Sequence, residues 1–288
     1  MREDSSLSNV LRLLGRWLEP LSDTPALDAQ VLLTHVLGKP RSWVLAHTDE
    51  VLDDATLTRL EQALHRLEGG EALPYVLGEW EFYGLTFTLT PAVLIPRPET
   101  EMLVEKALHW LRLHPERRLA AAVGCGSGCI AVSLAKHVPD LRLQAVDLSP
   151  AALEVARCNA VRQAVERQID FFQGDLLAPL HQPLDLICAN LPYIPSAILP
   201  TLQVRRREPS LALDGGSDGL QVIQRLIAQA PIHLAPGGVL FVEIEASQGA
   251  AVMELAQAVF PRASSQVIPD LAGRDRLLSI ATWNADPG

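Results

Sequence analysis

The chain has 288 residues, of which 48% are hydrophobic and 20% are charged. This length predicts about two domains of roughly 150 residues, and the composition is that of a globular protein, which excludes a disordered chain. The apolar runs are far shorter than the ~20 residues of a membrane helix, so no membrane segment is expected. With 24 basic and 34 acidic side chains the net charge is −10, which disfavours a general nucleic-acid binder and favours a basic protein partner.

The four cysteines lie in segments that we expect to be loop, helix and strand, so they do not suggest a disulfide framework. Cys125 and Cys129 are spaced like half of a zinc site, but no second Cys or His pair follows at a matching spacing, and we expect no metal. The first residues, Met-Arg-Glu-Asp, lack the apolar core of a signal peptide. A reducing cytoplasm is therefore the expected location.

Residues 1–73 carry apolar side chains at helical spacing without strand-like alternation, which predicts a small N-terminal helical bundle. Thr24 is the expected N-cap of a helix that begins at Pro25 and ends before Gly38, and Asp53 or Asp54 is the expected cap of another. Helices are predicted over about 10–21, over 25–37, from about 41, and over about 54–68. We find no catalytic constellation in this segment and interpret it as a substrate-docking domain.

Residues 74–90 are expected to link this bundle to a second domain over residues 91–288. The linker is rich in aromatic and β-branched residues, and Gly78 and Gly84 are turn candidates within it. This composition predicts a β-hairpin. Its aromatic side chains either pack within the linker or form the rim of a site, and we expect packing for most of them.

The second domain alternates predicted helices with apolar strands, which is typical of an α/β fold with a mostly parallel sheet covered on both faces. Ligands of such sheets bind beyond the carboxyl ends of the strands. The expected helices are 99–113, 129–137, 150–163, 218–234 and 248–259. The expected strands are 118–123, 141–146, 169–172, 184–189, 238–244, about 263–268 and 276–281.

The first of these strands runs into a glycine-rich loop, Gly124-Cys125-Gly126-Ser127-Gly128, followed by a helix. Glycines permit a tight turn and a close approach of the backbone to a ligand, and the helix N-terminus offers free N–H groups. A dinucleotide fingerprint requires glycine at the sixth position, which is Cys129 here. Glycines at positions one, three and five resemble instead the loop of S-adenosylmethionine-dependent methyltransferases.

Two acidic residues follow the next strands. Asp147 lies 19 residues after Gly128, where a carboxylate can accept hydrogen bonds from both ribose hydroxyls. Ser149 can cap the following helix by itself, so we favour the ligand role for Asp147. Asp175 either accepts a hydrogen bond from an adenine amino group or forms a turn, and the backbone of Leu176 beside it is a candidate contact to the base.

The most specific motif is Asn190-Leu191-Pro192-Tyr193, at the end of the strand LDLICA. A nitrogen conjugated to a π system is a poor nucleophile until its two hydrogens are held and its lone pair faces the incoming methyl group. The side-chain oxygen of Asn190 and the carbonyl of Leu191 can accept those hydrogens, and Pro192 restricts Leu191 to extended conformations. Tyr193 can stack on a flat substrate group. We therefore predict that Asn190, Pro192 and Tyr193 act in catalysis by positioning.

With these motifs the chain resembles the HemK/PrmC family of release factor glutamine methyltransferases over nearly its whole length. The resemblance rests on LPYVLGEWEFYGLTF, VLIPRPETE, GCGSG, NLPYIP, REPSLALDGGSDGL and GRDR. It implies a class I methyltransferase fold, Rossmann-like with a seven-stranded sheet, preceded by the helical domain and the hairpin. It also implies methyl transfer from S-adenosyl-L-methionine to the glutamine of the Gly-Gly-Gln motif of class I peptide chain release factors, in translation termination.

The resemblance assigns roles to particular residues. The cofactor would be bound by the loop from Gly124 to Gly128 and by Asp147, Asp175 or Leu176, and Asn190. The segment from Asn190 to Tyr193 would hold the substrate glutamine, and Arg97 would line the entrance to the site. Two positions depart from the family pattern, which usually has an acidic residue at position 122 and a Glu-Ile-Gly sequence after the fifth strand. The chain has Ala122 and Glu243-Ile244-Glu245.

Two other functions fit parts of the sequence. A nucleic-acid adenine amino-methyltransferase also uses an Asn-x-Pro-Tyr motif, but the acidic charge and the lack of a basic recognition domain disfavour a direct nucleic-acid substrate. The run Arg205-Arg206-Arg207 is the basic segment that would serve it, but the run fits equally well a contact with the backbone of a partner's basic loop or a solvated surface. A methyltransferase-like binding protein, weakened by the Ala122 change, is the non-enzymatic alternative, and cofactor titration separates it from the enzymes.

Overall fold

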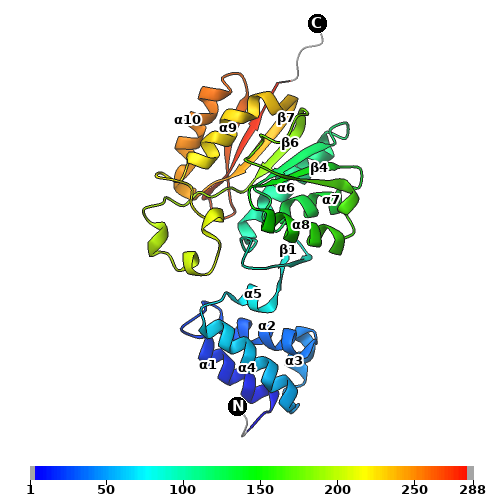
Figure 1. Ribbon diagram of the computed structural model, residues 1–288, viewed down its shortest axis with the longest axis vertical. Helices are drawn as coiled ribbons and strands as arrows, with labels where there is room; N and C mark the ends of the chain where they lie inside the picture. The colour runs from blue at the N-terminus through cyan, green and yellow to red at the C-terminus, as the bar shows by residue number, and fades with distance from the viewer. Residues whose placement is uncertain (1–3, 284–288) are drawn as a thin grey trace. The chain divides into compact units, whose positions relative to one another are not determined.

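The computed structural model describes residues 4–283. The chain divides into two compact units, Met1–Gly78 and Glu79–Gly288, the first of which is helical (Figure 1). Among the described residues, no helix combines the length and apolar composition that a membrane crossing requires. The helices of the first unit are α1 (Leu7–Leu18), α2 (Pro25–Leu37), α3 (Arg41–Ala46), α4 (Asp54–Glu68) and α5 (Leu73–Leu77).

The ends of the first-unit helices follow local chemistry. The carboxylate of Asp53 accepts a hydrogen bond of 2.7 Å from the Thr56 amide and so caps α4. Gly38 ends α2 in the left-handed region at φ +62°, where glycine has no Cβ penalty. Thr24 precedes α2 as predicted, but its hydroxyl donates to the Asp28 carboxylate and does not cap the helix.

The linker differs from its prediction, because Leu73–Leu77 is the helix α5 and the hairpin is confined to β1 (Glu79–Phe82) and β2 (Leu85–Thr88). The guanidinium of Arg66 bonds the carbonyls of Tyr75 and Val76, each at 3.0 Å, and satisfies the end of this short helix. The hairpin then turns tightly through Tyr83 and Gly84, both at positive φ. It belongs to the second unit.

The second unit is built on a seven-stranded sheet in the order β5-β4-β3-β6-β7-β9-β8. Strand β9 is antiparallel to both of its neighbours, and the pairings among the first five strands of that order are parallel. The strands are β3 (Leu119–Val123), β4 (Arg142–Asp147), β5 (Ile169–Gln173), β6 (Leu184–Ala189), β7 (Leu234–Glu243), β8 (Ser264–Pro269) and β9 (Asp275–Ala281). The predicted seven-stranded α/β fold is confirmed.

Helices cover both faces of this sheet. Residues of α9 and α10 share one buried cluster with alternate residues of β3, β6 and β7, while α6, α7 and α8 pack on the sheet from the other side (Figure 1). The helices are α6 (Pro98–Leu113), α7 (Cys129–His137), α8 (Pro150–Arg162), α9 (Gln221–His233) and α10 (Gly249–Val259). Successive side chains of a strand point to opposite faces of the sheet, so every second residue of a strand faces the same helices.

The chain between β6 and α9 departs from the regular alternation. It forms short 3₁₀ turns, and α9 begins at Gln221 instead of the predicted position 218, because Gly219 takes φ +78° just before it. Strand β7 begins at Leu234, before the predicted position 238, with a register irregularity against β6. The 3₁₀ segments are η1 (Glu166–Gln168), η2 (Leu199–Thr201), η3 (Gln203–Arg206), η4 (Ser210–Ala212) and η5 (Ala246–Gln248).

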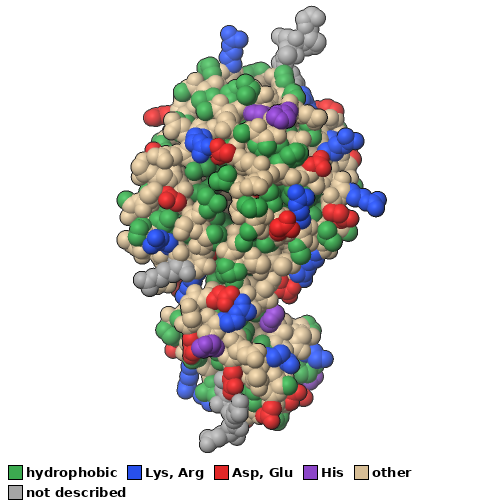
Figure 2. All heavy atoms as spheres, in the orientation of Figure 1, with side chains coloured by type: hydrophobic (Ala, Val, Ile, Leu, Met, Phe, Trp, Pro, Cys, Tyr) green, Lys and Arg blue, Asp and Glu red, His purple; other side chains and the backbone are tan. Residues whose placement is uncertain are grey.

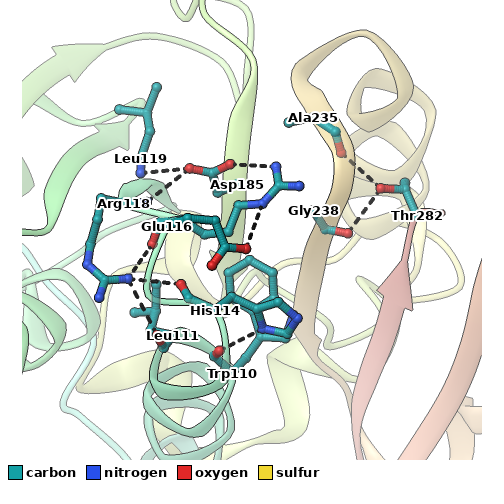
Figure 3. A network of polar contacts seen from close by, with 11 residues as sticks. Trp110, Leu111, His114, Glu116, Arg118, Leu119, Asp185, Ala235, Gly238 and Thr282 are labelled. Atoms are coloured by element: carbon teal, nitrogen blue, oxygen red, sulfur yellow. Dashed lines mark hydrogen bonds and ion pairs between the residues drawn. The ribbon is translucent and has the colours of Figure 1, made fainter. Parts of the chain in front are cut away.

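At the amino edge of the sheet, a polar network fixes the strands. The carboxylate of Asp185 accepts hydrogen bonds of 3.0 Å from the backbone amides of Arg118 and Leu119 and from the Arg117 guanidinium (Figure 3). These bonds join the first residues of β3 to β6. The Thr282 hydroxyl is within hydrogen-bond distance of the carbonyls of Ala235 and Gly238, near the start of β7.

Candidate functional site

The carboxyl ends of β3, β4, β5 and β6 open on a cavity of about 470 Å³ in the second unit. This volume lies within the range of small-molecule sites. The cavity brings together all the predicted site residues except Gly128 and Tyr193. Those that line it are Arg97, Gly124, Cys125, Gly126, Ser127, Asp147, Asp175, Leu176, Asn190, Leu191 and Pro192.

The glycine loop lies directly against the substrate motif. A Cβ on Gly124, whose φ is +65°, would come within 2.8 Å of a methyl carbon of Leu191. Gly126 also takes a left-handed conformation, at φ +53°, and its amide donates to the Asp147 carboxylate at 2.8 Å. Side chains at these two positions would strain the loop or fill its contact with the motif, so glycine is required here.

Gly128 has a different reason to be glycine. It is not among the residues that line the cavity, and a Cβ there would lie 3.0 Å from that of Ala156 on α8. Its φ of +79° also favours glycine. The residue therefore permits close packing behind the loop, and the sequence pattern alone does not distinguish this role from ligand contact.

Asp147 is held with its carboxylate at the cavity. One oxygen accepts from Gly126 and the other from the Ser149 amide at 2.9 Å, and burial nevertheless raises the pKa of this carboxyl. The Ser149 hydroxyl accepts from the Ala152 amide and caps α8, as predicted. The side chain of Asp147 is thus not the helix cap, which favours a ligand role for it.

At the far wall, Asp175 is paired with Arg225 of α9, a residue that the sequence did not single out. The contact involves one carboxylate oxygen and leaves the other available to a ligand. Leu176 beside it takes φ +53°, which is uncommon for a non-glycine residue and typical of functional turns. Both residues of the predicted base-binding turn therefore line the cavity, and Leu176 does so in a constrained backbone conformation.

Asn190 follows β6 directly, and its side-chain nitrogen donates to the hydroxyl of Thr100 at 2.8 Å. Thr100 is buried in the first turn of α6 and also lines the cavity. Sequence reasoning missed Thr100, although it lies within the IPRPETE segment, because nothing in the spacing shows that α6 begins against the end of β6.

The chain from Pro192 onward is held by the segment LDGGSDG. The Ile194 amide donates to the Leu213 carbonyl at 3.0 Å, and a Cβ on Gly215 would lie 2.8 Å from the Pro192 carbonyl oxygen. Tyr193 packs against the buried cluster of the sheet instead of lining the cavity. Burial, and secondarily the charge of Glu243, raises the pKa of Tyr193 to about 12. Stacking of Tyr193 on a substrate stays a prediction.

Arg97, expected at the entrance, is bound to Glu208 by an ion pair of 2.5 Å. Glu208 is buried, and its other oxygen accepts from the Ile95 amide at 3.0 Å. This carboxylate therefore joins the segment from Ile95 to Arg97, at the entrance, to the segment between η3 and η4. The sequence separation of 111 residues explains why only the structure reveals the pair.

The two departures from the family pattern have separate outcomes. Ala122 is 1% exposed and pairs with Ala145 and Cys188 inside the sheet, and it does not line the cavity. Glu245 caps η5 by accepting from the Ser247 amide at 2.7 Å. The Ser247 hydroxyl bond is the main reason that the pKa of Glu245 is lowered.

The chain is similar to several known proteins. Residues 10–78 match the family model of the PrmC N-terminal domain, and residues 100–198 match that of the methyltransferase small domain. A release factor glutamine methyltransferase of Moorella thermoacetica is 47% identical over 88% of this chain and 90% of its own length. A relative of the same name from Vibrio cholerae is 43% identical over 80% of this chain and 81% of its own length. Another, from Nitratidesulfovibrio vulgaris, is 38% identical over 95% of this chain and 94% of its own length.

Solved structures share the fold at lower identity. A ribosomal protein L11 methylase from Lactobacillus delbrueckii subsp. bulgaricus has a TM-score of 0.50 at 22% identity, over 68% of this chain and 84% of its own. A methyltransferase from Pyrococcus furiosus has a TM-score of 0.53 at 17% identity, over 77% of this chain and 99% of its own. These two structures show the methyltransferase fold. Because its relatives are 38–47% identical over most of its length, the chain belongs to the family of release factor glutamine methyltransferases.

Proposed function

We propose that the protein transfers a methyl group from S-adenosyl-L-methionine to the side-chain amide nitrogen of the glutamine in the Gly-Gly-Gln motif of class I peptide chain release factors. The observation that carries the proposal is that Asn190, Leu191 and Pro192 line the same cavity as the glycine loop and Asp147. The names of the relatives support the choice of acceptor.

The cavity fits the cofactor in its shape and its polar groups. A Cβ on Gly126, which lines the cavity, would meet no other group of the protein within 4 Å, so the loop leaves open space there. The half-buried Asp147 carboxylate, with a raised pKa, gains from hydroxyl donors. When bound, the cofactor supplies an electrophilic methyl group on a sulfonium. Asp147 would hold its ribose, and Asp175 with Leu176 would contact its base.

The chain positions the acceptor nitrogen and does not act as a strong base. The side-chain oxygen of Asn190 and the Leu191 carbonyl would accept the two hydrogens of a glutamine amide, which turns its lone pair toward the methyl group. Pro192 keeps Leu191 extended. Holding reactants in this way accounts for a large part of the rate without a change of protonation.

The partner is a basic protein surface presented to an acidic enzyme, whose net charge is −10. On the face in Figure 2, acidic and basic side chains are interspersed among the described residues. The helical unit, Met1–Gly78, serves as the docking module, and Arg97 borders the entrance. Action on release factors places the enzyme in the cytoplasm, where translation terminates.

The test is incubation of the protein with labelled S-adenosylmethionine and one of three acceptors: a class I release factor, a release factor with glutamate in place of the motif glutamine, and adenine-containing DNA. We expect label only in the first. The glutamate form is a matched control because it lacks the amide nitrogen. Label in DNA would favour the adenine amino-methyltransferase, and cofactor binding without any transfer would favour the binding protein.

A further inference from the structure

Glu243 is a buried carboxylate that the sequence analysis noted only as part of a family pattern. It ends β7, is 1% exposed, and neither of its oxygens is hydrogen-bonded within the described part of the chain. The Thr100 hydroxyl is nevertheless near enough to lower the pKa of this carboxyl. A buried carboxylate in this condition calls for a functional explanation.

Strand register places Glu243 beside Asn190. Ala189 of β6 pairs with Val242 of β7, so Asn190 and Glu243 are the next residues of two parallel neighbours. Ala189 and Val242 belong to the cluster on the α9 side, and alternation therefore turns Asn190 and Glu243 to the α6 side. Thr100, in the first turn of α6, accepts a hydrogen bond from Asn190 and lies near Glu243.

The charges around Glu243 come from several elements. Burial raises its pKa from its ordinary value near 4.5 to about 7, and the Thr100 hydroxyl opposes this rise. The charges of Arg276 and Arg97 also lower the pKa, and Glu99 raises it. Cys129 and Tyr193 also lie near enough to feel the Glu243 charge. The carboxyl is therefore poised to change its protonation near neutral pH.

The hydroxyl of Thr100 has one hydrogen to donate, so it can donate to only one of its two neighbours, Asn190 and Glu243. An ionised carboxylate only accepts, so a hydrogen bond between the two groups requires Thr100 to donate its hydrogen and leaves the Thr100 oxygen to accept from Asn190. The structure has this orientation, with the Asn190 nitrogen 2.8 Å from the Thr100 oxygen. The side-chain oxygen of Asn190 then points the other way. A reversed amide would present N–H groups to the substrate nitrogen and could not accept its hydrogen.

We propose that Thr100 and Glu243 are positioning residues that hold the Asn190 amide in the orientation that accepts a hydrogen bond from the substrate. The proposal rests on the proposed function for its consequence in catalysis, but not for the orientation itself. Glu243 does not line the cavity, so it acts through Thr100. When Glu243 is protonated it becomes a donor, Thr100 can donate to the Asn190 oxygen, and the amide can reverse.

The first test reads the amide directly, in the full chain without substrate. The side-chain ¹⁵N resonance of Asn190, assigned by its loss in Asn190→Asp, is followed against pH in the wild type and in Glu243→Gln. We expect a shift with a midpoint near pH 7 in the wild type and none at that midpoint in Glu243→Gln. Absence of the shift in the wild type, or its persistence in Glu243→Gln, overturns the proposal whether or not the protein methylates release factor.

The second test measures kinetics with release factor as acceptor. Thr100→Val removes the hydroxyl at nearly constant shape, and we expect kcat to fall on the order of 10- to 100-fold with KM for the cofactor little changed. Thr100→Ser keeps the hydroxyl and should restore kcat to within a few-fold. In the wild type, kcat should fall as the pH drops through about 7, and this limb should vanish in Glu243→Gln.

The outcomes separate the two claims. Equal kcat in Thr100→Val and the wild type, with both folded by circular dichroism, overturns the positioning role. A wild type that binds cofactor but never methylates release factor contradicts the proposed function alone, and the resonance of Asn190 still decides the orientation.

Discussion

Asp185 and Glu243 are carboxylates at opposite edges of one sheet, and their surroundings differ. Asp185, at the amino edge, accepts from two backbone amides and from Arg117 (Figure 3). Glu243, at the carboxyl edge, is more deeply buried, and neither oxygen has a hydrogen bond within residues 4–283. The amino edge contributes stability, while the carboxyl edge keeps a buried carboxylate unsatisfied behind the residues that line the cavity.

The largest effect is expected at the carboxyl edge, from Asn190→Ala. The substitution removes the acceptor for the substrate hydrogen, and loss of one positioned group typically costs about 2–4 kcal/mol of transition-state stabilisation. We expect methylation of release factor to fall accordingly, with an unchanged melting temperature. A folded variant with activity within a few-fold of wild type would remove Asn190 from the mechanism.

Asp147→Ala should weaken cofactor binding at the same edge. The ribose hydroxyls would lose the carboxylate as their charged acceptor, and a hydrogen bond of this kind is worth roughly 1.5–3 kcal/mol. Calorimetry of S-adenosylmethionine binding measures the change, with Ser149→Ala as a control that removes the cap of α8 and leaves the carboxylate. Unchanged affinity in Asp147→Ala would exclude the ribose role.

Asn190 and Asp147 were recognisable in the sequence because each lies at the carboxyl end of a strand whose limits are marked by composition. Helix Cys129–His137 and strand Leu184–Ala189 match their predicted ranges to the residue, since glycines or turns bound them. Helix α5 was mistaken for strand because its aromatic and β-branched residues suit both, and the bonds from Arg66 decide the outcome.

What the sequence does not contain is the order of the strands. Asn190 and Thr100 are 90 residues apart, and Arg97 and Glu208 are 111 apart. Such pairs follow from the neighbourhood of β6 and β7 and from where α6 begins, which no local pattern encodes. Local spacing therefore predicts the ligand-facing loops, and the groups that support them require the fold.

At the amino edge, Asp185→Ala should affect stability and not catalysis. Two backbone amides and the Arg117 guanidinium would lose their acceptor, and we expect a loss of about 1–3 kcal/mol in the free energy of unfolding. Denaturant titration measures it, and kcat measured on the folded protein should stay close to wild type. A large fall in kcat without a change in stability would contradict the division between the edges.

Glu243→Gln should change stability with the opposite sign. The folded-state pKa of Glu243 is raised above its unfolded value, so the folded state binds more protons between pH 4.5 and 7, and its stability falls as the pH rises through that window. The amide removes this penalty. We expect the melting temperature of Glu243→Gln to exceed that of wild type more at pH 8 than at pH 5, by roughly 2–4 °C per kcal/mol.

The central claim is that the carboxyl edge holds a glutamine amide for methylation. The most direct measurement is the position of the methyl group in a class I release factor after incubation with the protein and S-adenosylmethionine, mapped by fragmentation mass spectrometry. We predict a single methyl group on the side-chain nitrogen of the Gly-Gly-Gln glutamine, absent when Asn190→Ala replaces the wild type. A methyl group on another residue, or an equal yield from Asn190→Ala, would contradict this account.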